Sequence, residues 1–135
     1  MVRTLSLDGE WQILFDPENV GGNIWCQDTV FRQLAFRSIT VPSAWERLEK
    51  DYEGVAFYRR SFEVPREWTG KIVRLQFDAV NYLAEVWLND EAVGCHEGGF
   101  APFEFRVDHM LKPGQANVLT LRVVGPIFLS GKVID

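Results

Sequence analysis

The sequence predicts an all-β domain, built as a two-sheet antiparallel sandwich of the jelly-roll type. Apolar and polar residues alternate with a period of two through most of the second half of the chain. Turn-forming residues separate the alternating runs, as Lys-Pro-Gly does at 112–114. Helical periodicity is nearly absent, with one expected turn around residues 45–50. These features indicate about eight short strands around an aromatic-rich core.

Each expected strand has an apolar face and is bounded by a turn or a proline. The run at 57–64, for example, stops at Pro65. The pair Asn89-Asp90 lies between two strand-like runs and predicts a β-hairpin with a tight turn. In chain order, the expected strands are 11–15, 39–41, 57–64, 73–77, 83–88, 91–94, 103–107 and 119–123.

Arg60 is the residue that breaks this pattern. The strand parity that buries Tyr58 and Phe62 also turns Arg60 toward the interior. A buried guanidinium needs a carboxylate or several carbonyl groups, because an uncompensated charge there is strongly destabilising. An ion pair inside the sandwich, or a bulge that turns the side chain outward, would meet this need. The alternative is a functional arginine at a sheet edge or in a cleft.

Length and charge exclude several classes of protein. The chain has 135 residues, which suits one domain and is too short for a barrel enzyme of roughly 250 residues. The formal net charge is −5 without a basic stripe, so no nucleic-acid partner is expected. Neither a signal peptide nor a membrane span is visible in the sequence. We therefore expect a cytoplasmic protein with no membrane partner.

The sequence also lacks the motifs of metal sites and of common enzymes. Cys26 and Cys95 belong to no C-x-x-C pair, so we expect reduced, partly buried thiols. The two histidines, His96 and His109, lack the spacing of zinc ligands. Phosphate-loop, dinucleotide-binding and nucleophile-elbow motifs are missing. We therefore expect no metal, no cofactor and no catalytic residue in this chain.

Two groups of residues could contact a sugar. Acidic residues cluster at 46–53, where a carboxylate pair could serve glycoside hydrolysis, but interleaved basic residues favour a solvated loop. Aromatic residues outside the alternating runs could stack on sugar rings, or they could plug the ends of the sandwich. These loop aromatics are Trp25, Trp45, Tyr52 and Phe100.

Five segments of the chain occur in the order typical of one enzyme family. They are 7–11 (LDGEW), 41–46 (VPSAWE), 57–65 (FYRRSFEVP), 75–80 (LQFDAV) with 86–89 (VWLN), and 96–103 (HEGGFAPF). Together they resemble the N-terminal sugar-binding domain of family 2 glycoside hydrolases, the group of β-galactosidases, β-glucuronidases and β-mannosidases. The resemblance runs from about Leu5 to Val124. It implies a single sugar-binding sandwich over 1–135, of the galactose-binding-domain-like type.

The resemblance implies a non-catalytic role in the hydrolysis of O-glycosidic bonds. In the family, a pair of glutamates on a later TIM-barrel domain carries out catalysis, after an immunoglobulin-like domain, and neither domain fits in this chain. The N-terminal domain packs on the barrel and contributes side chains to the rim of the sugar pocket. The expected substrate-binding residues are Arg60, Trp45, Glu46 and Tyr52. Some β-galactosidases have an asparagine at the position of Arg60, whereas the glucuronidase-like branch has arginine, which puts galactose specificity in doubt.

Two other roles stay open, a free-standing carbohydrate-binding module and a purely structural domain that buries barrel surface. Family members usually continue past a segment like 123–126 into a loop and one more strand, whereas this chain stops at residue 135. We therefore expect a truncated sandwich that lacks its last strand. Its exposed sheet edge would invite pairing with another copy of the chain.

Overall fold

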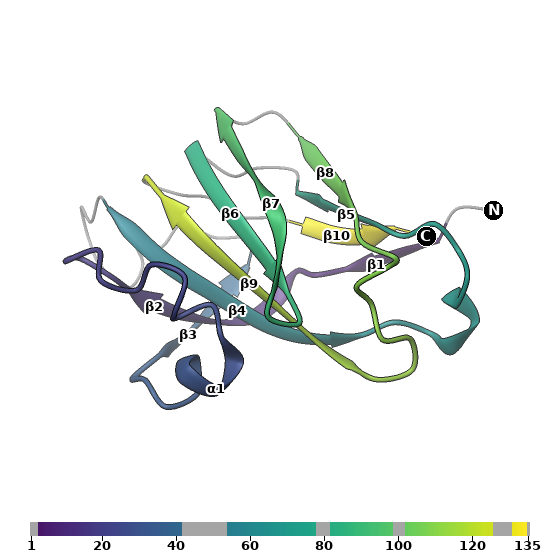
Figure 1. The fold of residues 1–135 in the computed structure, drawn as a ribbon, viewed down its shortest axis with the longest axis horizontal. Coiled ribbons are helices and arrows are strands. Elements are labelled where there is room, and N and C mark those ends of the chain that lie inside the picture. The colour runs from purple at the N-terminus through teal and green to yellow at the C-terminus, as the bar shows by residue number, and fades with distance from the viewer. Residues whose placement is uncertain (1–2, 42–53, 78–81, 99–101, 126–130, 135) are drawn as a thin grey trace.

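The computed structural model describes residues 3–41, 54–77, 82–98, 102–125 and 131–134. Within them the chain forms two antiparallel sheets, which confirms the predicted β-sandwich (Figure 1). The described strands are β1 (Thr4–Ser6), β2 (Gly9–Phe15), β3 (Arg37–Val41), β4 (Val55–Glu63), β5 (Arg74–Phe77), β6 (Tyr82–Leu88), β7 (Glu91–Gly98), β8 (Phe103–Arg106), β9 (Ala116–Val124) and β10 (Gly131–Ile134). The helical elements are α1 (Asp28–Phe31) and the short 3-10 helix η2 (Arg66–Trp68).

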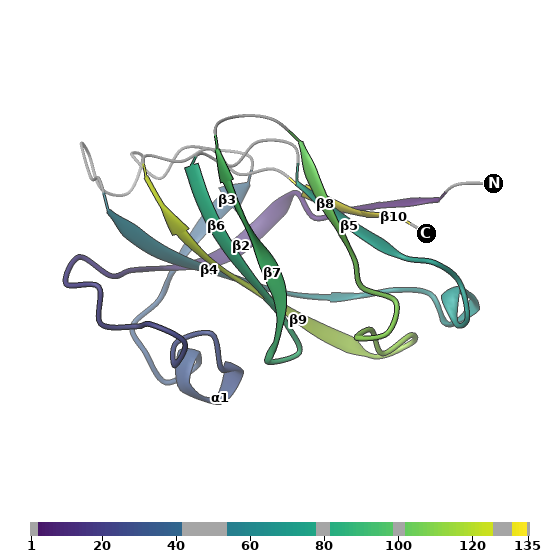
Figure 2. The same cartoon turned by 45° about the horizontal axis from the view of Figure 1, so that its top comes forward.

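The two sheets differ in size. The smaller sheet has four strands in the order β1-β10-β5-β8, and the larger has six in the order β3-β2-β4-β9-β6-β7. Both chain ends lie on the side of the four-stranded sheet (Figure 2). The hairpin predicted at Asn89-Asp90 is confirmed, since β6 pairs with β7 and both turn residues have a positive φ, 52° and 67°. Two such residues define the type I′ turn that matches the twist of a hairpin.

A described strand near the end of the chain was not among those predicted from the sequence. Gly131–Ile134 forms β10, which lies between β1 and β5 and pairs with both. The expectation that the sandwich is truncated before its last strand stays a prediction. In the described sheets the edge strands are β1 and β8 in the smaller sheet and β3 and β7 in the larger. Pairing of an exposed edge with another copy of the chain also stays a prediction.

The main core lies between the two sheets, where the alternating apolar residues meet. Trp11 of β2 and Tyr58 of β4 are fully buried there and contact each other edge to face, with ring centroids 6.3 Å apart. The four-stranded sheet contributes inward residues such as Leu75 and Val133, both 1% exposed or less. The period-two pattern in the sequence therefore assigned the inner faces of β2, β4 and β5 correctly.

A second, smaller core lies on the outer face of the six-stranded sheet, which the sequence did not predict. Residues 16–36, called here the covering segment, lie against that face and include α1 (Figure 2). Phe31 of α1 and Phe57 of β4 are both 0% exposed, and Trp25 packs on Phe57 with ring centroids 5.4 Å apart. As a result, β4 is buried on both faces from Val55 to Tyr58.

Polar contacts fasten the covering segment to the sheet. Arg59 of β4 forms an ion pair with Asp28 at the start of α1, and its Nε lies 2.6 Å from Asp28 Oδ1. Arg122 of β9 forms an ion pair with Glu85 and donates to Asn19 Oδ1 at 2.8 Å. The two arginines therefore connect the six-stranded sheet to the covering segment, and their charges neutralise the carboxylates of Asp28 and Glu85.

Tyr58 is a buried tyrosine whose hydroxyl has no hydrogen-bond partner among the described residues. Burial raises the pKa of Tyr58 above its ordinary value near 10. The unfolded chain therefore loses this proton before the folded chain does, and stability falls as the pH rises through about 10.

We expect Tyr58→Phe to be as stable as the parent chain at neutral pH and more stable than it above about pH 10. Denaturant titrations of both chains between pH 7 and pH 11 measure this difference. Equal alkaline losses of stability in the two chains would contradict the account.

Candidate functional site

Arg60 lies where strand parity placed it, on the inner face of β4. Its Nη1 donates to the carbonyl oxygens of Leu7 at 2.6 Å and Asp8 at 2.8 Å. These carbonyls belong to the connection between β1 and β2, where the chain crosses from one sheet to the other. The pairing of β4 with β9 is continuous from Val55 to Glu63, so no bulge turns Arg60 outward. Carbonyl groups therefore stabilise the guanidinium, as one of the expected arrangements requires.

The residues Leu7, Asp8, Gly9 and Arg60 form what we call the Arg60 corner. Leu7 O also accepts a hydrogen bond from Trp11 Nε1 at 2.7 Å, and Leu7 N donates to Gly131 O at 3.1 Å. The corner is thus fixed by β2, β4 and β10 together. Arg60 itself is half-buried, and both of its described contacts use one nitrogen of the guanidinium. An arginine held in this way can offer its remaining N–H groups to a carboxylate or to sugar hydroxyls without first being ordered.

Gly9 makes room for the guanidinium, a role that the sequence did not reveal. A Cβ atom at position 9 would lie 3.3 Å from Arg60 Nη1, and Gly9 has a φ of +129°, which other residues rarely adopt. The signal that could have found it is the Asp8-Gly9 pair at the start of a strand, since glycine at such a place often marks a close approach of another group.

We expect Gly9→Ala to lower the free energy of unfolding by about 1–3 kcal/mol through its φ alone, and to displace Arg60 as well. Gly98→Ala is a matched control, because Gly98 has a φ of +132° and its nearest described side-chain atom would be 3.9 Å away. Thermal unfolding of the two variants measures the difference. If Gly9→Ala lowered the free energy of unfolding no more than Gly98→Ala does, the close approach of Arg60 to position 9 would make no contribution to stability.

The other predicted site residues, Trp45, Glu46 and Tyr52, lie outside the described residues. Segment 42–53 follows Val41, the last residue of β3, and Val41 is the Cα partner of Gly9. Val41, which directly precedes this segment in the sequence, therefore pairs with Gly9 of the Arg60 corner. The grouping of these three side chains with Arg60 stays a prediction, as does their contact with substrate.

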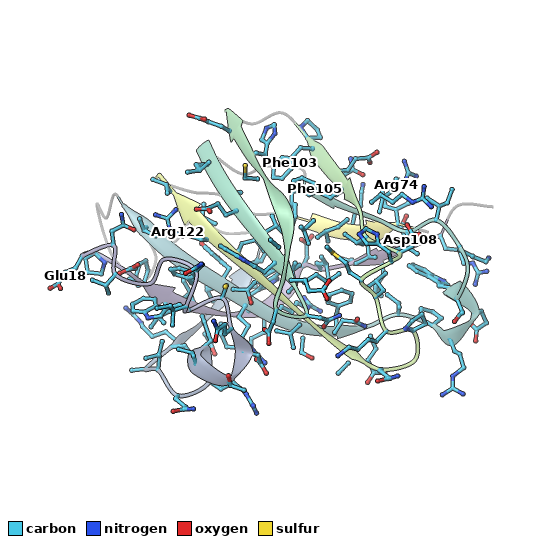
Figure 3. The ribbon with its side chains drawn as sticks, viewed as in Figure 1. Glu18, Arg74, Phe103, Phe105, Asp108 and Arg122 are labelled. Atoms are coloured by element: carbon cyan, nitrogen blue, oxygen red, sulfur yellow. The ribbon has the colours of Figure 1, made fainter. Side chains whose placement is uncertain are left out.

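The loop aromatics have different outcomes. Trp25 is half-buried against Phe57, so it packs in the second core, on the outer face of the sheet rather than at an end of the sandwich. Phe100 lies outside the described residues. An aromatic contact that the sequence did not predict joins His96 of β7 to Phe103 of β8, whose rings stack with centroids 4.1 Å apart. Figure 3 shows Phe103 and Phe105 near each other on β8.

The thiols and the acidic groups suggest no further chemistry in the described part of the chain. Both cysteines are free; Cys26 is buried and Cys95 is exposed rather than partly buried. Burial raises the pKa of the Cys26 thiol and so reduces its reactivity. Among the described residues, no group of three or more His, Cys, Asp or Glu could hold a metal ion. No described helix is long and apolar enough to cross a membrane.

Fold and sequence together identify the class and family of the chain. Two antiparallel sheets around one main core define it as a β-sandwich domain. Residues 4–133 match the family described as glycosyl hydrolases family 2, sugar binding domain. The chain belongs to this family, which confirms the resemblance seen in the sequence.

Curated relatives and solved structures agree with this assignment. The chain is 33% identical over 124 residues to a β-glucuronidase of Paenibacillus borealis, covering 87% of this chain and 20% of that protein. It is 40% identical over 100 residues to a β-galactosidase of Thermoanaerobacter pseudethanolicus, covering 69% and 14%. The apo β-glucuronidase of Ruminococcus gnavus superposes with a TM-score of 0.88 at 26% identity, covering 98% of this chain and 29% of that one. The chain thus spans about a fifth of the first relative and less than a third of the solved structure.

Proposed function

We propose that this chain is the non-catalytic first domain of a longer family 2 glycoside hydrolase, and that it shapes the substrate pocket of the intact enzyme. The observation that carries the proposal is the Arg60 corner, in a chain that matches the sugar-binding domain of the family over residues 4–133. The substrate would be a β-glycoside. The barrel domain of the enzyme would be the main partner of this domain.

The chemistry of Arg60 supports a substrate that carries an acceptor group. A guanidinium held at one nitrogen by Leu7 O and Asp8 O keeps its forked geometry for a second group. Carboxylates suit this fork better than hydroxyls do, because both oxygens can accept at once. One solved relative, the β-glucuronidase of Ruminococcus gnavus, is described in complex with D-glucuronic acid. Within the proposal, a uronic acid is therefore the preferred sugar.

Arg60→Met in the longer enzyme tests this role. The variant keeps much of the apolar stem and removes the charge, and we expect kcat/KM on a nitrophenyl β-glucuronide to fall about ten- to a hundredfold. Arg60→Lys keeps the charge without the fork and should recover part of the loss. Arg74→Met is a control, since Arg74 forms an ion pair with Glu104 on the exposed face of the smaller sheet. An unchanged kcat/KM in Arg60→Met would contradict the proposal.

Two measurements separate the alternative roles from this proposal. For a purely structural domain, Arg60→Met lowers the melting temperature and the active fraction, while kcat/KM per folded molecule stays constant. A free-standing carbohydrate-binding module has no hydrolytic activity to lose, but it would bind sugar at the Arg60 corner in the isolated chain. Titration calorimetry of the chain with galactose, glucuronic acid and mannose tests this role, and measurable binding that Arg60→Met removes would favour it.

We also propose a cytoplasmic location, supported by the two free thiols. Fractionation of the source cells tests this, and recovery of the protein outside the cytoplasm would contradict it.

A further inference from the structure

A cavity of about 230 Å³ lies away from the Arg60 corner and shares no residue with it. Its floor is apolar and is formed by Val64, Trp68 and Val73, which are 3% exposed or less. Polar residues at its rim include Thr69 and Asp108. We call it the Trp68 cavity. Figure 3 shows Asp108 on the side of Arg74, at the opposite end of the molecule from Glu18 and Arg122.

Backbone hydrogen bonds hold the walls of the Trp68 cavity in place. On one side, Trp68 N donates to Pro65 O at 3.0 Å, and Lys71 N donates to Trp68 O at 3.1 Å. Across the cavity, Val107 N donates to Val73 O at 2.9 Å. A fourth bond, from Gly114 N to Val64 O at 2.9 Å, ties the connection between β8 and β9 to the end of β4. The cavity is therefore preformed, which reduces the entropic cost of binding a ligand.

Asp108 gives the cavity a fixed acceptor. Its carboxylate accepts from Arg106 Nε at 2.8 Å and Nη2 at 3.3 Å, and from Val73 N at 3.4 Å. The hydrogen bond from Arg106 lowers the pKa of Asp108 to about 2, so the carboxylate is ionised at neutral pH. About four lone-pair sites exist on a carboxylate, so these three bonds leave room for one more donor.

Size and chemistry together point to one sugar ring. Sites for drug-sized ligands occupy roughly 300–1,000 Å³, so a cavity of about 230 Å³ suits a single ring better than a disaccharide. A pyranose has an apolar face of C–H groups, which matches the floor, and a rim of hydroxyls, which can donate to Asp108 and Thr69. The charged residues that line the cavity, Lys71 and Asp108, carry opposite signs and show no excess that favours a charged ligand.

We propose that the Trp68 cavity is a second carbohydrate site, which binds one neutral hexopyranose on this domain without the rest of an enzyme. The site goes beyond the proposed role of Arg60, because it needs neither the Arg60 corner nor a catalytic barrel. It would hold a saccharide unit remote from the bond being cleaved. Binding of a single ring through few contacts is weak, and we expect a dissociation constant on the order of millimolar.

Nuclear magnetic resonance of the 135-residue chain tests the proposal, with methyl β-D-glucopyranoside and methyl β-D-galactopyranoside as probes. At least one probe is expected to shift the methyl signals of Val64, Val73 and Leu111 in a saturable way, while the signals of the Arg60 corner stay in place. No saturable shift up to about 50 mM sugar would overturn the proposal, as would shifts confined to the Arg60 corner. Glucuronate should bind more weakly than the neutral sugars, and equal or tighter binding would overturn the assignment to a neutral ring.

Two matched variants localise the site. Asp108→Asn removes the charged acceptor and is expected to weaken binding roughly five- to tenfold. Glu104→Gln removes a comparable exposed carboxylate, paired with Arg74 outside the cavity, and should change the dissociation constant by less than about twofold. Unperturbed spectra of the free variants establish that both are folded. Equal effects of the two substitutions would overturn the site. A negative result for this site would leave the Arg60 proposal unaffected, because that proposal is tested by the activity of the longer enzyme.

Discussion

Phe57→Ala is expected to lower the free energy of unfolding by about 3–5 kcal/mol. Phe57 is 0% exposed, yet it lies on the outer face of β4, where a simple sandwich would meet water. Its ring packs against Trp25 and belongs to the same cluster as Phe31. Truncation would leave a void between the sheet and the covering segment that neighbouring rings cannot fill without moving.

Denaturant unfolding of Phe57→Ala against Phe36→Ala measures this effect. Phe36 also belongs to the covering segment and stacks on Phe31 at 5.7 Å, but it is 40% exposed. We expect its truncation to cost less than about 1 kcal/mol. Similar small losses in both variants would mean that the covering segment is not packed on the sheet.

Asn117→Ala should have the second large effect, a loss of about 3 kcal/mol. Asn117 is 0% exposed, and its side chain joins three parts of the chain. Its Oδ1 accepts from Lys112 N at 2.9 Å and Asn89 Nδ2 at 3.0 Å, and its Nδ2 donates to Lys112 O at 3.2 Å and Gln115 O at 3.1 Å. Removing this amide leaves buried groups without partners, which costs more than the bonds themselves contribute.

A double-mutant cycle with Asn89→Gly tests whether the two amides act together. Glycine accepts the positive φ of position 89, so the substitution removes the side chain without adding strain. We expect a coupling energy of about 1 kcal/mol or more between positions 89 and 117. Asn23→Ala, at an exposed loop position, is the control and should cost less than about 0.5 kcal/mol. Additive losses would show that the network is not cooperative.

The sequence predicted the parts of the fold that depend on local patterns. Strands such as β9 and β2 alternate regularly, and the Asn89-Asp90 pair marks its own turn, because strand period and turn type are short-range properties. Strand β10 was missed because its four residues show too little alternation. Its identity as a strand depends on partners more than fifty residues away, at Leu75, and more than a hundred away, at Leu5.

The site shows the same division between local and long-range information. Parity along β4 placed Arg60 inward correctly, because alternation is a property of the strand itself. The carbonyls of Leu7 and Asp8 that receive it come from more than fifty residues earlier in the chain, and no period in the sequence connects them. The covering segment was missed for a related reason, since residues 16–36 lack a regular period and include a helix of four residues.

The central proposal is that this domain shapes the substrate pocket of a longer glycoside hydrolase without carrying out the catalysis itself. The most direct test is the assay of the purified 135-residue chain on the nitrophenyl β-glucuronide, β-galactoside and β-mannoside. We predict no release of nitrophenol above the buffer rate with any of the three. Turnover that co-elutes with the chain would contradict the claim, because it would place the reacting groups inside this sandwich.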